Sequence, residues 1–292
     1  MPRFFIDAPL RRGASLALPD TVVRHVQVLR LQAGDALTLF NGAGPAHAAT
    51  LADIGRKHAV ATLGDALPPN GTEPPYRIEL AQGIAGNEKM DWLIEKAVEL
   101  GVSRIAPLLA ERSVVRLSGE RAARRHAHWQ ALVRAACEQC ARDVVPEVVA
   151  PTGFHPWLDA AAPLSRGAAV LGAAMPDAAM TDAAASAITA RASPSRAPGQ
   201  PSGEPPAAGA PPRPLRLLLS PRATLRFADL PQTPPPGGVS LLIGPEGGWS
   251  PEEESRAQEA GYAALSLGPR ILRTETAGIA LLAALAGRWG GW

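Results

Sequence analysis

The stretch that decides the fold is residues 239–287, VSLLIGPEGGWSPEEESRAQEAGYAALSLGPRILRTETAGIALLAALAG. Their pattern is strand, glycine-rich loop, helix, strand, loop and helix. The run 250–253 (SPEE) is a capping box with proline at the first helical position, and Gly261 predicts the end of that helix. Strands that alternate with helices predict an α/β domain with a largely parallel sheet. Ligands of such sheets bind beyond the carboxyl ends of the strands. We therefore expect a binding site formed by 244–248 (GPEGG) and 268–276 (GPRILRTET).

The same alternation is present upstream. Residues 76–84 (YRIELAQGI) and 103–110 (SRIAPLLA) have the apolar content of strands, and 87–101 (NEKMDWLIEKAVELG) between them has a helical period. The apolar stripe of that helix consists of Met90, Leu93, Ile94, Ala97 and Val98. Residues 119–142 predict a long amphipathic helix with a basic outer face, and 167–174 (GAAVLGAA) predicts a third strand.

Residues 1–67 have a different pattern, with short alternating runs around glycine-rich turns and one short helical run at 20–30 (DTVVRHVQVLR). Several short strands at close spacing predict a small β-barrel. The run 68–75 (PPNGTEPP) is typical of a linker. We therefore expect an N-terminal domain over 1–70 and a larger α/β domain over 75–292.

Residues 174–213 interrupt the larger domain. They consist mainly of Ala, Pro, Ser and Gly, and no aromatic residue occurs between Trp157 and Phe227. Such a segment cannot bury enough apolar surface to offset its ordering entropy, so we expect a disordered insertion.

Composition excludes several classes of protein. The chain has 292 residues, of which 46% are hydrophobic and 19% charged, an ordinary globular balance. No apolar run reaches the ~18–20 residues of a membrane span, and the N-terminus lacks the features of a signal peptide. We therefore expect a cytoplasmic protein without a membrane partner. The net charge is only +2, and the basic residues are almost all arginines.

The two cysteines, Cys137 and Cys140, form a lone C-x-x-C inside a helical pattern. Zinc needs about four ligands, and the sequence has no second C-x-x-C. We expect ordinary thiols and no metal site.

The chemistry of the GPEGG loop narrows the ligand. No Gly-Lys-Ser/Thr follows it and the spacing is not G-x-G-x-x-G, so neither a P-loop nor a dinucleotide fingerprint is present. Glu246 would repel a phosphate, whereas a carboxylate suits hydroxyls, amines or a cation. S-adenosylmethionine carries a sulfonium, an amine and a ribose but no phosphate. A tight turn that only caps the following helix explains the loop equally well.

Several motifs together resemble one family. LLIGPEGGWSPEE (241–253) followed by LGPRILRTETAG (267–278) is similar to the paired C-terminal motifs of the RsmE family, bacterial 16S rRNA uridine N3-methyltransferases of the SPOUT superfamily. EKMDWLIEKAVELGV (88–102), PLLAERSVV (107–115) and EQCARDVVPEV (138–148) resemble its middle motifs, and the N-terminal region resembles its PUA-like domain. Departures are small: Trp249 stands where Phe is usual, Glu95 where Gln is common, and 174–213 is an insertion.

The resemblance implies an N-terminal PUA-like β-barrel, a C-terminal α/β trefoil knot that binds S-adenosylmethionine, and a homodimer with its site near the interface. The implied substrate is a uridine in the decoding region of 16S rRNA, within the 30S subunit. Residues implied to bind the cofactor are Leu219, Ile243, Gly244, Pro245, Glu246, Gly247, Gly248, Leu267, Gly268, Arg270, Ile271, Leu272, Thr274 and Ala277. The residues that we expect to contact RNA are Arg3, Arg24, Arg30, Lys89, Arg112, Arg134 and Arg142. From charge alone, a solvated basic face explains the arginines of 101–142 equally well.

The reaction itself suggests the catalytic residues. Uridine N3 must lose a proton, so a base is needed, or donors that stabilise the uracil anion. We expect Arg273 to stabilise the anion or place a phosphate, and Glu246 and Glu275 are the candidate bases. Each carboxylate could instead form a structural salt bridge with Arg270 or Arg273. A SPOUT enzyme that acts on tRNA and a non-catalytic RNA-binding protein remain alternatives.

Overall fold

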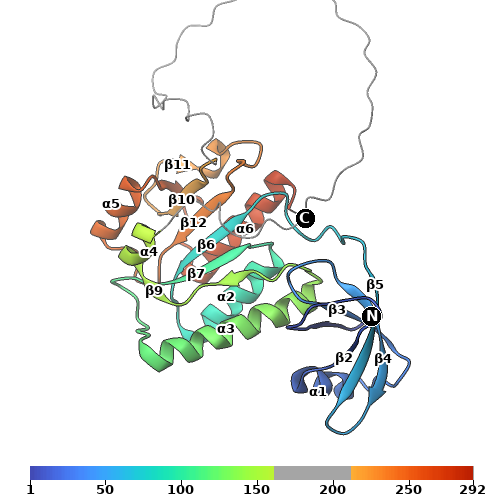
Figure 1. The fold of residues 1–292 in the computed structure, drawn as a ribbon. Coiled ribbons are helices and arrows are strands. Elements are labelled where there is room, and N and C mark those ends of the chain that lie inside the picture. The colour runs from blue at the N-terminus through green and yellow to red at the C-terminus, as the bar shows by residue number, and fades with distance from the viewer. Residues whose placement is uncertain (161–211, 292) are drawn as a thin grey trace, which may run out of the picture.

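The computed structural model describes residues 1–160 and 212–291, which form two sheets with their helices (Figure 1). The strand expected at 167–174 and nearly all of the expected insertion, 174–213, lie outside the described residues. Within the described part of the chain, no helix combines the length and the apolar character that a membrane crossing requires.

The N-terminal sheet has five strands in the order β1-β3-β4-β5-β2. β1 runs parallel to β3, and the other pairs are antiparallel. The elements are β1 (Arg3–Phe5), β2 (Ser15–Ala17), α1 (Asp20–Val28), β3 (Ala36–Phe40), β4 (His47–Ile54) and β5 (Ala59–Ala66). Val22, Val23 and Val26 of α1 are buried against the apolar side chains of this sheet. β2 was not expected, because three residues without a β-branched side chain give no strand signal.

The second sheet is parallel throughout and follows the order β11-β13-β10-β12-β6-β7-β8, with β9 also paired to β7. Its main strands are β6 (Ile78–Gly83), β7 (Arg104–Leu109), β10 (Leu215–Leu219), β12 (Val239–Ile243) and β13 (Ala263–Ser266). The short ones are β8 (Glu147–Val148), β9 (Thr152–Gly153) and β11 (Leu225–Arg226). The predicted parallel α/β sheet is therefore confirmed.

Helices cover both faces of this sheet, which explains its continuous apolar strands. The helices are α2 (Asn87–Glu99), α3 (Gly119–Cys140), α4 (Phe154–Ala160), α5 (Pro251–Glu259) and α6 (Thr274–Trp289), with a 3₁₀ turn, η1 (Phe227–Asp229). Alternate residues of β12 face opposite layers: Leu241 packs in the cluster of α2, α3 and α6, and Leu242 packs in that of α4 and α5. The predicted stripe of α2 is buried throughout.

The predicted start and end of α5 are also confirmed. The Ser250 hydroxyl accepts the backbone N–H of Glu253 at 3.3 Å, and the Glu253 carboxylate accepts that of Ser250 at 2.9 Å. Pro251 occupies the first turn, and Gly261 follows the helix with φ +88°. This cap fixes the point at which the GPEGG loop enters α5.

The end of α3 joins the two sheets. Arg142 is 2% exposed; its guanidinium pairs with Glu73 in the linker and donates to the carbonyls of Val98 and Val102, both at 2.9 Å. The predicted RNA contact of Arg142 is therefore wrong, because its side chain is buried and its donors are used inside the protein.

Two more of the arginines expected to bind RNA belong to the same joint. Arg3 pairs with Asp143 and donates to the carbonyl of Arg142, and its side chain is 12% exposed. Arg134 lies over the ring of Phe5, 4.7 Å from its centroid. Both side chains contact β1 or α3 across this joint. Arg3 is mostly buried and paired with Asp143, whereas Arg134 is half-buried and contacts Phe5 through its guanidinium face.

Candidate active site

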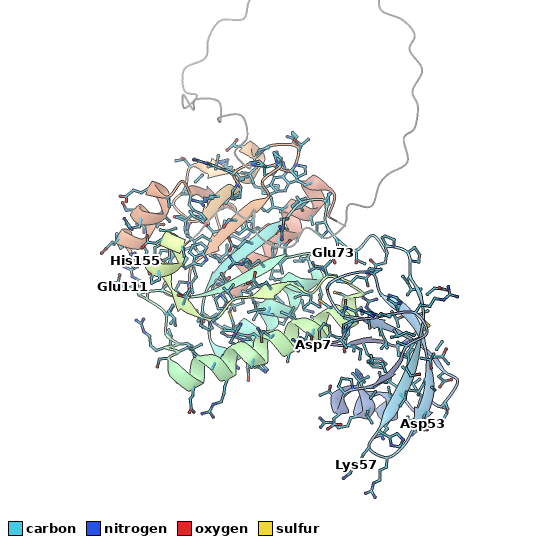
Figure 2. The ribbon with its side chains drawn as sticks, in the orientation of Figure 1. Asp7, Asp53, Lys57, Glu73, Glu111 and His155 are labelled. Atoms are coloured by element: carbon cyan, nitrogen blue, oxygen red, sulfur yellow. The ribbon has the colours of Figure 1, made fainter. Side chains whose placement is uncertain are left out.

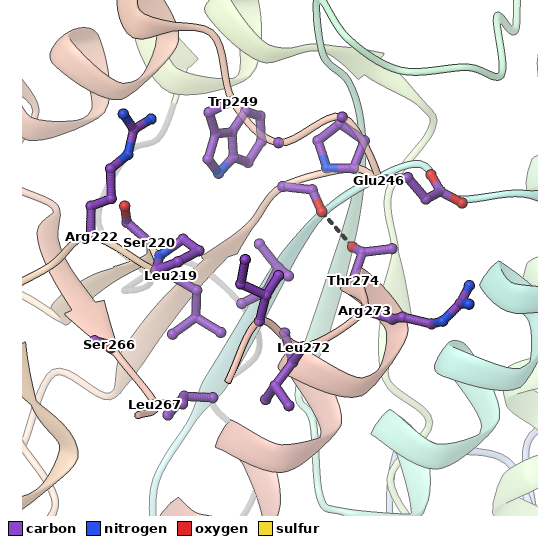
Figure 3. A pocket seen from close by; sticks show the side chains of 18 of the residues that line it. Leu219, Ser220, Arg222, Glu246, Trp249, Ser266, Leu267, Leu272, Arg273 and Thr274 are labelled. Carbon is purple, nitrogen blue, oxygen red and sulfur yellow. Dashed lines mark hydrogen bonds between the residues drawn. The ribbon is translucent and has the colours of Figure 1, made fainter. Parts of the chain in front are cut away.

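The carboxyl ends of β10, β12 and β13 open into a cavity of about 540 Å³ (Figure 3). Three chain segments supply most of its lining, 219–222, 243–249 and 265–274. Every residue expected to bind the cofactor lines this one cavity, from Leu219 to Ala277. The parallel sheet explains the convergence, because the ends of its strands meet at one edge.

A buried group of hydrogen bonds among Gln82, Thr274 and Gly244, here called the polar node, lies at the floor of the cavity. Gln82 at the end of β6 is fully buried, and its amide donates to the Thr274 hydroxyl at 2.9 Å and to the Gly83 carbonyl at 2.9 Å. The Thr274 hydroxyl in turn donates to the carbonyl of Gly244 (dashed line in Figure 3). The node ties the start of α6 to the GPEGG loop. Sequence analysis missed Gln82, although one amide in an apolar strand was a usable signal.

Two glycines bring backbones into close contact beside the cavity. A Cβ on Gly83 would lie 2.5 Å from the Pro245 nitrogen. A Cβ on Gly247 would lie 2.9 Å from the carbonyl oxygen and the Cβ of Arg112. Gly247 therefore packs against the 110–113 turn, which makes that turn part of the wall of the site.

Charged side chains gather at one end of the cavity. Glu246 accepts the backbone N–H of Gly86 at 3.1 Å and lies 3.2 Å from Lys89, which is also 3.8 Å from Glu275. The alternative considered for both carboxylates was a salt bridge with Arg270 or Arg273; in the described residues Lys89 pairs with both of them instead. Burial raises the pKa of Glu246, but the N–H of Gly86, its own backbone N–H and Lys89 outweigh burial and lower it overall.

Arg270 and Arg273 are exposed and belong to the loop that leads into α6. Figure 3 shows Arg273 on the same side of the cavity as Glu246, with Arg222 and Trp249 on the opposite side. Arg222, Ser220, Trp249 and Ser266 line the cavity but were not among the expected residues. Trp249 is 7% exposed and packs against Phe154, with 5.1 Å between the ring centroids. Its departure from the usual Phe was the signal that could have identified it.

Both cysteines lie on α3. Cys137 is buried and Cys140 is half-buried, and both are free thiols. Burial raises the pKa of Cys137 to about 12 and also raises that of Cys140. In residues 1–160 and 212–291, no three His, Cys, Asp or Glu side chains are grouped as a metal site would require.

The remaining arginines expected to bind RNA are exposed and lie in two separate parts of the chain. Arg24 and Arg30 lie on and after α1, and Arg112 lines the cavity while donating to the Trp249 carbonyl at 3.3 Å. Figure 2 shows Lys57 and Asp53 at the tip of the β4–β5 hairpin, at the opposite end of the molecule from Glu111 and His155.

Comparison with known proteins gives the same architecture. A family model described as RNA methyltransferase domain matches residues 72–187 and 208–286, and one described as RNA methyltransferase PUA domain matches 18–64. The ribosomal RNA small subunit methyltransferase E of Buchnera aphidicola is 28% identical over 291 residues, which cover 99% of this chain and 97% of that protein. That of Bacillus subtilis is 27% identical, covering 98% and 96%.

Solved structures agree. The ribosomal RNA small subunit methyltransferase E of Neisseria gonorrhoeae, bound to S-adenosylmethionine, is 34% identical with a TM-score of 0.76, covering 99% of this chain and 98% of that one. A putative methyltransferase of Legionella pneumophila, in complex with the same cofactor, is 31% identical with a TM-score of 0.76, covering 98% and 96%. The expected PUA-like domain followed by a SPOUT-type α/β domain is thus confirmed, and the chain belongs to the ribosomal RNA small subunit methyltransferase E family of RNA methyltransferases.

Proposed function

We propose that this protein transfers a methyl group from S-adenosylmethionine to N3 of a uridine in 16S rRNA, within the 30S subunit in the cytoplasm. One observation carries the proposal: both C-terminal motifs and the end of β10 line a single cavity at the carboxyl edge of the sheet. Membership of the methyltransferase family over nearly the whole chain supports the choice of reaction.

The cavity suits S-adenosylmethionine chemically. Leu219, Ile243, Leu265, Leu267 and Leu272 give it apolar walls that fit a nucleobase. The ionised carboxylate of Glu246 at one end fits a ligand with a positively charged sulfur. Gly247 packs closely against the turn at Arg112, and the GPEGG loop lines the cavity. Because its glycines have no side chains, the loop backbone can lie next to a bound ligand. These residues would hold the cofactor.

Bound S-adenosylmethionine supplies an electrophilic methyl group on a positively charged sulfur, so much of the catalysis is positioning. The protein must orient the uracil, accept or release the N3 proton and stabilise the negative charge that results. Arg273 precedes α6 at the cavity rim and carries an exposed guanidinium suited to the uracil oxygens. Glu246, with its lowered pKa, is a weak base and serves better as a fixed negative charge. Glu275 is the remaining candidate for proton acceptor.

We further propose that the protein acts as a homodimer with α6 at the interface. Residues 277–287 of α6 are all apolar, and Ile279, Ala280, Ala283 and Ala284 remain half-exposed in one chain. A helix that is hydrophobic on every side is normally buried. Light scattering after gel filtration tests this proposal: Ala283→Arg should convert a dimer to a monomer, and a monomeric wild type would refute it.

The function is tested by incubating purified protein with labelled S-adenosylmethionine and 30S subunits from cells that lack the modification. Digestion and mass spectrometry of the nucleosides should give 3-methyluridine. A 2′-O-methylated nucleoside would show that the methylated atom is not N3 of uridine. Label that enters only tRNA would show that the substrate is not 16S rRNA. Cofactor binding without transfer to any RNA would favour a non-catalytic RNA-binding protein.

A further inference from the structure

Lys89 lies where three parts of the chain meet. It occupies the first turn of α2, and its ammonium is 3.2 Å from Glu246 in the GPEGG loop and 3.8 Å from Glu275 in the first turn of α6. Glu246 also accepts the N–H of Gly86, the residue before α2, at 3.1 Å. One cation therefore connects the cofactor loop with the starts of two helices.

We propose that Lys89 is a positioning residue of the methyl-transfer site, which holds Glu246 and Glu275 in place at the cavity rim and does not bind an RNA phosphate. The proposal rests on the function proposed above and replaces the RNA contact expected for Lys89. It explains why a lysine lies among the lining residues of a cavity that has no need of a phosphate site.

The surroundings of Lys89 argue against a phosphate contact. Two carboxylates lie within 4 Å of its ammonium, and its side chain is 36% exposed. A phosphate that approached would meet both negative charges and would have to displace one of them. Arg24 and Arg30 have no carboxylate partner within the described residues and offer unopposed positive charge to RNA.

The carboxylates depend on Lys89 to different degrees. Glu246 keeps the N–H of Gly86 if the lysine is removed. The side chain of Glu275 is only 15% exposed, and its Oε2 is buried without a hydrogen-bond partner in the described part of the chain. Lys89 is the single cation that the described residues place beside Glu275. Its loss would leave a mostly buried carboxylate uncompensated, so Glu275 should move from its place at the cavity rim.

The experiment compares Lys89→Met with Lys96→Met. Lys96 lies on the same helix, its side chain is 35% exposed and it also pairs with a carboxylate, Glu99, but it does not line the cavity. Three quantities are measured: the affinity for S-adenosylhomocysteine by calorimetry, the single-turnover rate with saturating cofactor and 30S subunits, and the salt dependence of binding to 30S subunits. The Lys89→Arg variant keeps the charge.

Lys89→Met should weaken S-adenosylhomocysteine binding by about fivefold to tenfold (on the order of 1–1.4 kcal/mol) and slow single turnover by at least about tenfold. Its salt slope should equal that of the wild type. Lys96→Met should match the wild type throughout, and Lys89→Arg should recover most of the affinity.

A salt slope reduced by about 0.7–0.9, with unchanged affinity for S-adenosylhomocysteine, would show a phosphate contact and overturn the proposal. Equal losses in Lys89→Met and Lys96→Met would also overturn it. If the wild type binds S-adenosylhomocysteine but does not methylate 30S subunits, the proposed function fails, while the binding comparison still tests Lys89.

Discussion

The cofactor loops and the arginine-rich segment differ in where their side chains go. Residues 243–249 and 265–274 face each other across one cavity. Six of the arginines between 104 and 142 have separate partners: Arg104 pairs with Glu79, Arg116 donates to the Ala110 carbonyl, Arg124 pairs with Glu120, Arg125 lies over Trp129, Arg134 lies over Phe5, and Arg142 pairs with Glu73. Loops at the carboxyl ends of parallel strands converge at one edge of the sheet. These arginines lie on β7, in loops and on different sides of α3, so they meet different neighbours.

The largest expected effect is on stability, and it should come from a substitution of Arg142. Arg142→Ala removes donors from the buried carbonyls of Val98 and Val102 and from Glu73, and we expect a loss of about 3 kcal/mol in the free energy of unfolding. Urea denaturation measures it. Arg124→Ala is the control, because that side chain is 80% exposed and its pair with Glu120 should contribute under about 0.5 kcal/mol. If both variants unfold with the same free energy, the contacts of Arg142 contribute no more to stability than those of an exposed arginine.

The next effect concerns catalysis in the cofactor loops. Arg273→Lys keeps the charge but loses the planar guanidinium, so single turnover at saturating substrate should slow by about a hundredfold. The affinities for cofactor and for 30S subunits should change by less than about tenfold. Separate binding titrations check this. A rate that recovers at saturating 30S subunits would make Arg273 a binding residue, and a collapse of cofactor affinity would make it part of the cavity wall.

The sequence predicted the lining of the cavity better than it predicted the surroundings of the arginines, for a physical reason. The helix stripe, the cap at Ser250 and the convergence of the two loops follow from local patterns and from the geometry of a parallel sheet. Whether Arg142 is buried depends on Glu73 in the linker, a residue far away in sequence. The role of Lys89 depends on Glu246 and Glu275, which no local pattern connects to it.

A third variant tests the contact between the two regions. Gly247→Val places a Cβ at 2.9 Å from the carbonyl oxygen of Arg112, so the loop or the 110–113 turn must move. We expect S-adenosylhomocysteine to bind about tenfold more weakly, with the protein still folded by circular dichroism. Gly44→Val is the control, because its Cβ would meet nothing within 4 Å and its φ is not positive. Unchanged affinity in Gly247→Val would mean that the turn yields without disturbing the cavity.

The smallest expected effect distinguishes the exposed Arg112 and Arg24 from the half-buried Arg134. Arg112 is exposed at the cavity rim, and a single bond of 3.3 Å to the Trp249 carbonyl leaves most of its donors available. If it contacts one phosphate, Arg112→Gln should reduce the slope of log K against log salt by about 0.7–0.9 and weaken binding to 30S subunits only modestly. Arg24→Gln should behave in the same way. Arg134→Gln should leave the slope unchanged, because that side chain lies over Phe5 in the joint. If all three variants keep the salt slope of the wild type, RNA binds elsewhere. A reduced slope in Arg134→Gln alone would mean that the joint between the two sheets opens to admit RNA.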